Sequence, residues 1–187
     1  MDQPYKEVCY SQTTISELMI PAYANFGGKI HGGILLSLMD KVAYACSSKH
    51  AGNYCVTVSI ENVDFLEPVE VGEMVTMFAS VNYVGRTSMV VGIKVIAENF
   101  KQGTVKHTNT SYFTMVAKDD NGKPTPVPGL ILETNDEVRR FLEAIQHKEL
   151  KAAYKRDLEN AKMAVIVESG NGILANERCE LRLKGEF

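Results

Sequence analysis

The spacing of apolar residues changes after residue 47, and this change predicts the order of the secondary structure. Apolar side chains surround almost all of the helix that would run from Ile34 to Ser47, and no glycine or proline interrupts it. A helix with so little polar surface is usually buried. Short turns join the later segments, which predicts an antiparallel sheet. Apolar and polar residues alternate, as in half-buried strands, in the segments 56–65, 75–83, 89–97 and 105–117.

Two further features complete the predicted order. Residues 11–20 are rich in threonine, isoleucine and leucine and stop at Pro21, which predicts a first strand. In the segment 56–65 the apolar phase flips near Glu61 and Asn62, where a β-bulge is expected. The expected fold class is therefore α+β, with one strand, one long helix and then about four strands.

The C-terminal part of the chain differs in composition. Prolines at positions 124, 126 and 128 predict an extended linker, which ends a first domain of residues 1–130. A capping signature at Thr134 opens a charged helix that is expected to run to Met163. Residues 131–187 would form this C-terminal helix and a tail. The tail, residues 164–187, could be a strand, a partner-binding segment or disordered.

Charge and composition argue against several classes of function. The net charge is −3 and the pI about 5.8, without a basic run, so neither nucleic acid nor an anionic membrane is expected as the main partner. No apolar stretch is long enough to span a bilayer, and the first residues lack the pattern of a secretory signal. The four cysteines form no CxxC pair, which predicts free thiols, no zinc site and a cytoplasmic location.

Asp40 is a candidate catalytic residue because it lies near the middle of the predicted buried helix. Burying a carboxylate is costly unless it is paired. Asp40 could therefore be a general base or nucleophile in an apolar pocket, or one half of a structural ion pair. The polar residues of this helix follow one another at helical spacing and form one narrow stripe: Ser37, Asp40, Lys41 and Tyr44.

A glycine-rich loop precedes the predicted helix. Gly32 and Gly33 would let a ligand approach the first helical N–H groups, where negative charge is favoured, so these groups could hold a developing oxyanion. A plain turn is the alternative. His31 is expected to pack in the loop, with a role as a base as the alternative. Asn25 could orient a water or a carbonyl, or could bond its own backbone as a turn residue.

The run from Asn25 to Asp40, NFGGKIHGGILLSLMD, resembles the signature of hotdog-fold acyl-CoA thioesterases. The resemblance is to those related to brain acyl-CoA hydrolase and its short bacterial homologues. It implies a long central helix wrapped by an antiparallel sheet, in a homodimer with continuous sheets that assembles into a hexamer, a trimer of dimers. Further matching stretches are spread over residues 10–130: Val56-Thr57, 63–72, 85–89 and 119–128.

The resemblance also implies a role for each residue of the motif. Asn25 would position the water or the carbonyl, and Asp40 would be the general base or nucleophile. The N–H of Gly33 would belong to the oxyanion site, with His31 and Gly32 beside the substrate.

A second stretch would hold the coenzyme A part of the substrate. In similar proteins Arg86, Thr87 and Ser88 lie along this moiety, and Arg86 is the candidate for a phosphate contact. The implied ligand is an acyl-CoA substrate, and no metal or redox cofactor is expected.

The distance between Gly33 and Asp40 argues for a shared site. Seven residues of helix separate them, a rise of about 10 Å. An aspartate that far along would struggle to reach a carbonyl held at the start of its own helix. The antiparallel helix of a second subunit could bring its own Asp40 there, giving two equivalent sites per dimer.

The sequence therefore predicts a cytoplasmic acyl-CoA thioesterase that releases a free acid and CoA. Two alternatives stay open. One is a hydratase or dehydratase of acyl thioesters on the same fold, which would rely on a catalytic histidine such as His31. The other is a non-catalytic acyl-CoA-sensing module whose charged helix and tail engage a partner.

Overall fold

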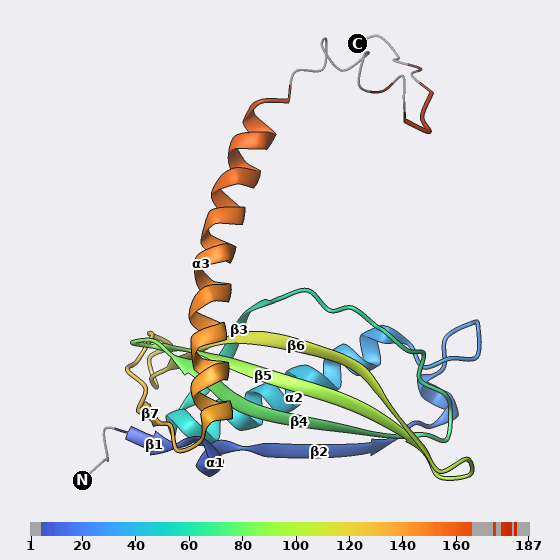
Figure 1. Ribbon diagram of the computed structural model, residues 1–187, viewed down its shortest axis with the longest axis horizontal. Coiled ribbons are helices and arrows are strands. Elements are labelled where there is room, and N and C mark those ends of the chain that lie inside the picture. The colour runs from blue at the N-terminus through green and yellow to red at the C-terminus, as the bar shows by residue number, and fades with distance from the viewer. Residues whose placement is uncertain (1–4, 166–173, 175–176, 181, 183–187) are drawn as a thin grey trace. The chain divides into compact units, whose positions relative to one another are not determined.

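The computed structural model describes residues 5–165, 174, 177–180 and 182 (Figure 1). The chain separates into two compact units, residues 1–145 and 146–187. The division predicted after residue 130 stays a prediction, and the compact unit that holds the sheet extends to Ile145. Most of the stretch 164–187, whose structure the sequence left open, lies outside the described residues.

A five-stranded antiparallel sheet and one long helix form the first unit (Figure 1). The helix, α2 (Gly32–Ala51), contacts all five strands of this sheet, as the resemblance implied for a helix wrapped by a sheet. In spatial order the strands are β2 (Thr13–Leu18), β4 (Met74–Val84), β5 (Ser88–Asn99), β6 (Thr104–Lys118) and β3 (Tyr54–Ile60).

Smaller elements surround the sheet. A second sheet pairs β1 (Tyr5–Glu7) with β7 (Gly129–Ile131) in parallel. The short helices are α1 (Val8–Ser11) and the 3₁₀ turn η1 (Pro21–Tyr23). The last element is the charged helix α3 (Asn135–Met163), close to its predicted bounds. No helix among the described residues has the length and apolar character that crossing a membrane requires.

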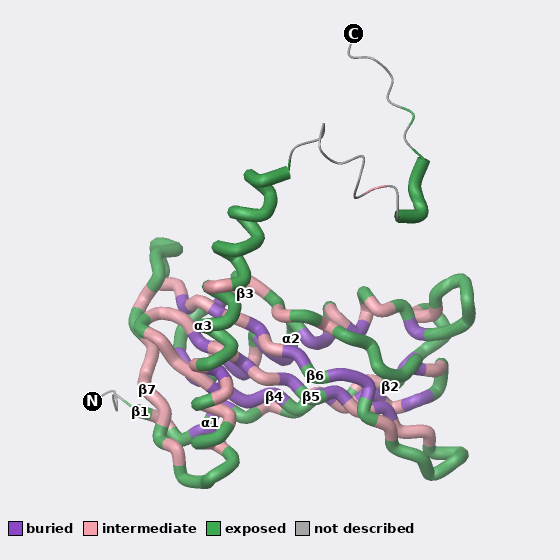
Figure 2. Tube along the Cα trace, turned by 45° about the horizontal axis from the view of Figure 1, so that its top comes forward, coloured by how far each residue is buried: buried purple, intermediate pink, exposed green. Residues whose placement is uncertain are grey.

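The core lies where α2 meets the sheet (Figure 2). Along β5, and along β4 as far as Ala79, every second residue is buried, as the alternating pattern predicted. All four cysteines are free thiols, as expected, and burial raises the pKa of Cys46 to about 12. The helix contributes Met39, Val42, Ala43 and Cys46, and the strands contribute Val75, Met77, Val91, Phe113 and Met115.

Two predicted boundaries are wrong for identifiable reasons. The strand expected over 56–65 ends at Ile60, and its irregular register lies between Thr57 and Ser59 rather than near Glu61 and Asn62. Beyond Ile60 the chain leaves the ladder as a loop, although it still makes single backbone bonds to β6. The first strand begins later than expected, because residues 8–11 form the helical turn α1.

Candidate active site

The loop before α2 is closed by Asn25. Its Oδ1 accepts hydrogen bonds from the backbone N–H groups of Gly27 (2.9 Å) and Lys29 (3.2 Å). Its backbone N–H donates to the Lys29 carbonyl at 2.7 Å. Asn25 therefore does act as a turn residue, and because its oxygen is engaged, the amide NH₂ is the part of this exposed side chain that can meet a ligand.

His31 caps the start of α2. Its Nδ1 accepts the N–H of Gly33 at 2.9 Å, so the neutral ring carries its proton on Nε2. A Cβ atom at Gly33 would lie only 2.9 Å from Nδ1, which explains why glycine occupies this position. The N–H expected in the oxyanion site is thus occupied by the imidazole here. A substrate oxygen can use this N–H only after the ring moves.

Phe65 is a neighbour of this loop that the sequence analysis did not identify. A Cβ atom at Gly32 would lie 3.2 Å from Cε2 of the Phe65 ring, so the ring lies over the first turn of α2. Phe65 belongs to the loop after β3, and 48% of its surface is exposed. The loop of Asn25 and the loop of Phe65 therefore form one exposed surface beside the helix start.

The expectation that Asp40 is buried is wrong for a single chain. All members of the predicted polar stripe, Ser37, Asp40, Lys41 and Tyr44, are exposed. The helix is buried on its other side, because only that side packs against the sheet. Asp40 therefore lies on an open stripe of α2 that a further subunit could cover.

Thr57 holds Asp40 in place across two elements. Its Oγ1 donates to Asp40 Oδ1 at 2.6 Å, the short distance typical of a hydroxyl bonded to a carboxylate. The same hydroxyl lies 3.4 Å from the Met115 sulfur. The sequence pattern predicted only that Thr57 is a strand residue that faces solvent. The matching Val56-Thr57 pair was the available signal, but the partner became visible only once α2 packed beside β3.

Arg86, Thr87 and Ser88 form the turn between β4 and β5. The Thr87 carbonyl accepts from the N–H of Ala117 and the Arg86 carbonyl accepts from the N–H of Val127, so the turn is fixed by its backbone. The Arg86 side chain is exposed.

Within one chain, the structure does not bring this turn to the other candidate residues. The turn lies at the end of the sheet near the C-terminus of α2, opposite the loop of Asn25 and His31 (Figure 1). A helix of 20 residues separates the two ends, about 30 Å. A single chain therefore contains two incomplete halves of the expected site.

A hollow of about 660 Å³ lies elsewhere on the first unit. It is lined by β2, β4, β5 and β6 and by Arg139, Arg140 and Glu143 at the start of α3. None of the candidate catalytic or CoA-contacting residues lines it. The hollow is therefore not the expected thioester site.

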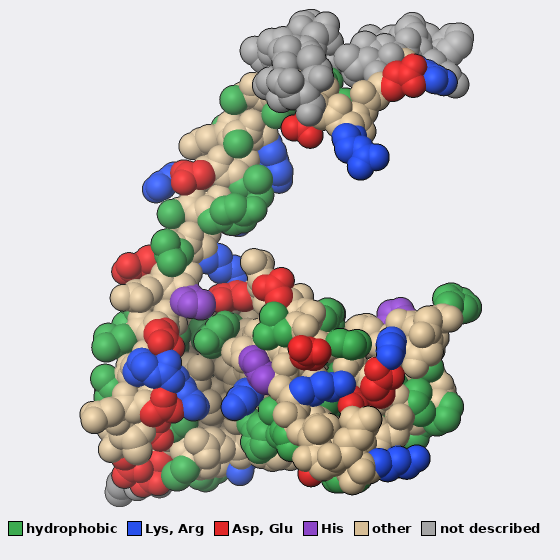
Figure 3. Space-filling view, turned by 45° about the vertical axis from the view of Figure 1, so that its right-hand side comes forward, with side chains coloured by type: hydrophobic (Ala, Val, Ile, Leu, Met, Phe, Trp, Pro, Cys, Tyr) green, Lys and Arg blue, Asp and Glu red, His purple; other side chains and the backbone are tan. Residues whose placement is uncertain are grey.

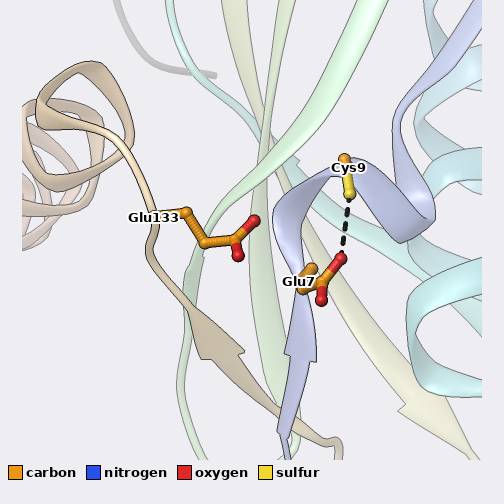
Figure 4. Close-up of side chains that lie close together, drawn as sticks. All are labelled: Glu7, Cys9 and Glu133. Carbon is orange, nitrogen blue, oxygen red and sulfur yellow. Dashed lines mark hydrogen bonds between the residues drawn. The ribbon is translucent and has the colours of Figure 1, made fainter.

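One cluster of the described residues has the spacing of a metal site: Glu7, Cys9 and Glu133 (Figure 4). The Cys9 thiol donates to Glu7 Oε2 at 3.3 Å, and this hydrogen bond raises the pKa of Cys9. A thiol ligand must be deprotonated, so the cluster disfavours the thiolate that a metal would need. We assign no ligand to it, and the absence of a metal requirement stays a prediction.

Comparison with known proteins identifies the family. Residues 27–118 match the family described as Thioesterase superfamily. Protein VdlD of Helicobacter pylori is 48% identical over 137 residues, which are 73% of this chain and 78% of that protein. The crystal structure of an apo-hexameric acyl-CoA thioesterase has 36% identity and a TM-score of 0.78, covering 81% of this chain and 97% of that one. The chain belongs to the hotdog-fold acyl-CoA thioesterase family. The hotdog fold and the enzyme class, acyl-CoA thioester hydrolase, are thereby confirmed.

An acyl-CoA hydrolase from Staphylococcus aureus is a further relative of this thioesterase chain. It has 31% identity and a TM-score of 0.77, covering 86% of this chain and 98% of that one. Its structure contains butyryl coenzyme A, coenzyme A and coenzyme A disulfide. Similar structures exist for variants of that hydrolase in which one asparagine, one aspartate or one threonine is replaced by alanine.

Proposed function

We propose that this chain hydrolyses acyl-CoA thioesters to a free carboxylic acid and CoA, at a site that two subunits share. The observation that carries the proposal is Asp40, a carboxylate held by Thr57 on an exposed stripe of α2. An anchored carboxylate that is open on one side can meet both a water and a substrate. The names of the relatives give the substrate class.

Spacing along the chain supports the choice of residues. In the S. aureus hydrolase, the replaced asparagine, aspartate and threonine lie as far apart along the chain as Asn25, Asp40 and Thr57 do here. Thr57 is therefore added to the proposed site beside the catalytic Asn25 and Asp40. Its role is to position Asp40, because it contacts the carboxylate and not the reacting atoms.

In the proposed reaction a water oxygen attacks the thioester carbonyl carbon. Asp40 takes a proton from this water through Oδ2, since Oδ1 accepts from Thr57. The Asn25 amide donates to the carbonyl oxygen, where negative charge develops. The C–S bond then breaks, CoA leaves as the thiolate and takes up a proton, and the carboxylic acid is released. Water and a carboxylate suffice for these steps, so we propose that no metal or redox cofactor takes part.

The partner subunit is proposed to pair along β3. This strand is at the edge of the sheet, and its side chains include the exposed Tyr54, Val58 and Ile60. An exposed apolar edge strand is an unstable arrangement for a free monomer. Antiparallel pairing of two β3 strands would join the sheets and cover the stripe of α2 that holds Asp40.

Pairing would also supply the missing half of the site. It would bring the turn of Arg86, Thr87 and Ser88 from one subunit toward the loop of Asn25 and Gly33 in the other. Arg86 would then contact a CoA phosphate. We further propose that the dimers assemble as a trimer of dimers, since one relative is hexameric, and that the enzyme acts in the cytoplasm, where its four thiols stay reduced.

Thiol release from a series of acyl-CoAs, from acetyl-CoA to stearoyl-CoA, tests this function. We expect turnover by the wild-type chain and its loss in Asp40→Ala and in Asn25→Ala, with both variants folded and as oligomeric as the wild type. Ser37→Ala, on the same exposed stripe, is the matched control and should keep its activity.

Each other outcome contradicts part of the proposal. Unchanged turnover in Asp40→Ala would remove the assigned base. Binding of acyl-CoA by the wild type without turnover of any chain length would instead favour the non-catalytic sensing module. Hydration of an enoyl-CoA without thiol release would favour the hydratase.

A further inference from the structure

The second half of α3 carries an apolar stripe of its own. We call residues 146–163 the distal helix; they belong to the second compact unit. Figure 3 shows hydrophobic, acidic and basic side chains along this exposed helix. The stripe side chains Leu150 and Tyr154 are 68% and 66% exposed. The stripe consists of Leu150, Tyr154, Leu158 and Ala161, spaced by four, four and three residues.

This spacing is typical of helices that pack side by side. Apolar residues separated by three or four positions return to the same face of a helix, the pattern of a helix–helix seam. A helix that is isolated in water is only marginally stable, and most helices in proteins are stabilised by packing such a face against a neighbour. The stripe is therefore a face on which a second helix can pack.

Charge identifies that partner and its direction. At 100° per residue, all four lysines of the distal helix fall on one flank of the stripe. The other flank carries Glu149 and Asp157 and no lysine, and its cation, Arg156, lies farther from the stripe than both carboxylates. The four lysines are Lys148, Lys151, Lys155 and Lys162.

Two copies of this helix are complementary in only one orientation. In a parallel pair, the lysine flank of one helix lies beside the acidic flank of the other. In an antiparallel pair the two lysine flanks would meet, which is repulsive. Two ion pairs within the helix, Arg156–Asp157 at 3.6 Å and Lys162–Glu159 at 3.8 Å, are long and exposed, and pairs of this kind are weak.

We propose that the distal helix associates in parallel with the same segment of a second copy of this chain, through the stripe of Leu150, Tyr154, Leu158 and Ala161. This contact is additional to the edge-strand pairing, and it does not depend on the proposed hydrolysis. The distal helix would thus provide a contact between subunits that the first compact unit, residues 1–145, does not provide.

Cysteine cross-linking of the full-length chain tests both the contact and its direction. The exposed Cys9 and Cys179 are first replaced by serine. Leu150→Cys and Leu158→Cys are then made separately and oxidised mildly at low protein concentration. In a parallel pair each residue meets its own copy within disulfide range, so each variant should form covalent dimers. Ala152→Cys, on the opposite side of the helix, is the matched control and should stay monomeric on a denaturing gel.

In an antiparallel pair, position 150 of one helix would instead lie beside position 158 of the other. Cross-links that form only in a mixture of the two variants would therefore overturn the parallel orientation. Absence of cross-links in both variants and in their mixture would reject the self-association.

Charge reversal gives a second measurement. In the Leu150→Cys chain, adding Lys151→Glu and Lys155→Glu should lower the cross-linked yield severalfold. Adding Glu149→Lys and Asp157→Lys to the same chain should restore the yield. A yield that does not respond to the lysine reversal would contradict the parallel arrangement. Thiol release measured in parallel should not change, since these residues lie outside the proposed site.

Discussion

At the scale of single residues, the site depends on one hydrogen bond between α2 and β3. Asp40 is exposed, and the Thr57 hydroxyl at 2.6 Å is the contact that fixes its carboxylate. A hydrogen bond to a charged group contributes about 1.5–3 kcal/mol. The bond leaves the other oxygen of the Asp40 carboxylate unbonded to Thr57, so it orients the proposed base without occupying both of its oxygens.

Replacing Thr57 should therefore slow catalysis without abolishing substrate binding. We expect Thr57→Val to lower kcat about tenfold or more, since about 1.4 kcal/mol corresponds to a factor of ten, with KM for the acyl-CoA nearly unchanged. Thr57→Ser keeps the hydroxyl and should recover most of the rate. Steady-state kinetics of the two variants make the comparison. Equal rates in Val and Ser variants would show that the hydroxyl plays no part.

At the scale of elements, α2 is anchored at its C-terminus by His50. This side chain is fully buried, and its Nε2 lies 3.0 Å from the carbonyl of Pro128 in the segment before β7. The Lys6 ammonium donates to the His50 carbonyl at 2.7 Å. Among the described residues, Nδ1 of His50 is one of two buried side-chain nitrogen or oxygen atoms that lack a hydrogen-bond partner. The helix end, the proline segment and the N-terminal strand therefore meet at one buried imidazole.

This imidazole should make stability depend on pH. Burial lowers the pKa of His50 below its usual value of 6.5; the hydrogen bond to Pro128 partly opposes this shift, and the charge of Lys6 adds to it. The unfolded chain then binds a proton that the folded chain rejects, so stability falls as pH drops below about 6.5 toward the lower folded pKa. We expect thermal unfolding to shift downward between pH 7.5 and 5.5, and to shift less in His50→Gln.

Carboxylates titrate in both proteins, so the difference between the two shifts isolates His50. Both proteins are measured at one concentration, because oligomer stability depends on it. An identical pH dependence in the variant would rule out the buried imidazole as its source.

At the scale of the whole molecule, the candidate site exists only in halves. The loop of Asn25 and the turn of Arg86 lie at opposite ends of one sheet, and Asp40 lies about 10 Å along α2 from Gly33. In the proposed dimer a two-fold partner would resolve both separations at once, because each subunit would supply the residues that the other lacks. Catalysis should therefore be a property of the dimer.

Mixed dimers test this property. Asn25→Ala and Asp40→Ala, each inactive alone, should recover activity when the two chains are co-expressed. Half of randomly formed dimers are mixed, and one of the two sites in each mixed dimer has both residues intact. About a quarter of the wild-type rate is therefore expected. Thiol release from the purified mixture is the measurement, and the separate variants are the controls. No recovery would place Asn25 and Asp40 of one site in the same subunit.

The sequence by itself determined the long helices, the main strands and their order, but not the short elements α1, β1 and β7. The apolar period changed from helical to alternating close to the end of α2, which runs on to Ala51, because burial on one face imposes that period on each element. The motif from Asn25 to Asp40 and the polar stripe of α2 were equally visible, since they are local. The bulge predicted near Glu61 and Asn62 was wrong because the alternation of apolar and polar residues continues past Ile60 into a loop that still runs beside β6.

Tertiary structure alone decided what each residue touches. The bond from Thr57 to Asp40, the ring of Phe65 over Gly32 and the exposure of Asp40 all join segments that are distant in sequence. Their partners depend on how α2 packs across the sheet, and periodicity carries no information on that. The separation of the Arg86 turn from the Asn25 loop is likewise set by the length of α2 and the strand order. For this reason the candidate residues of the proposed site could be named from the sequence, while the contacts that hold them follow from the fold.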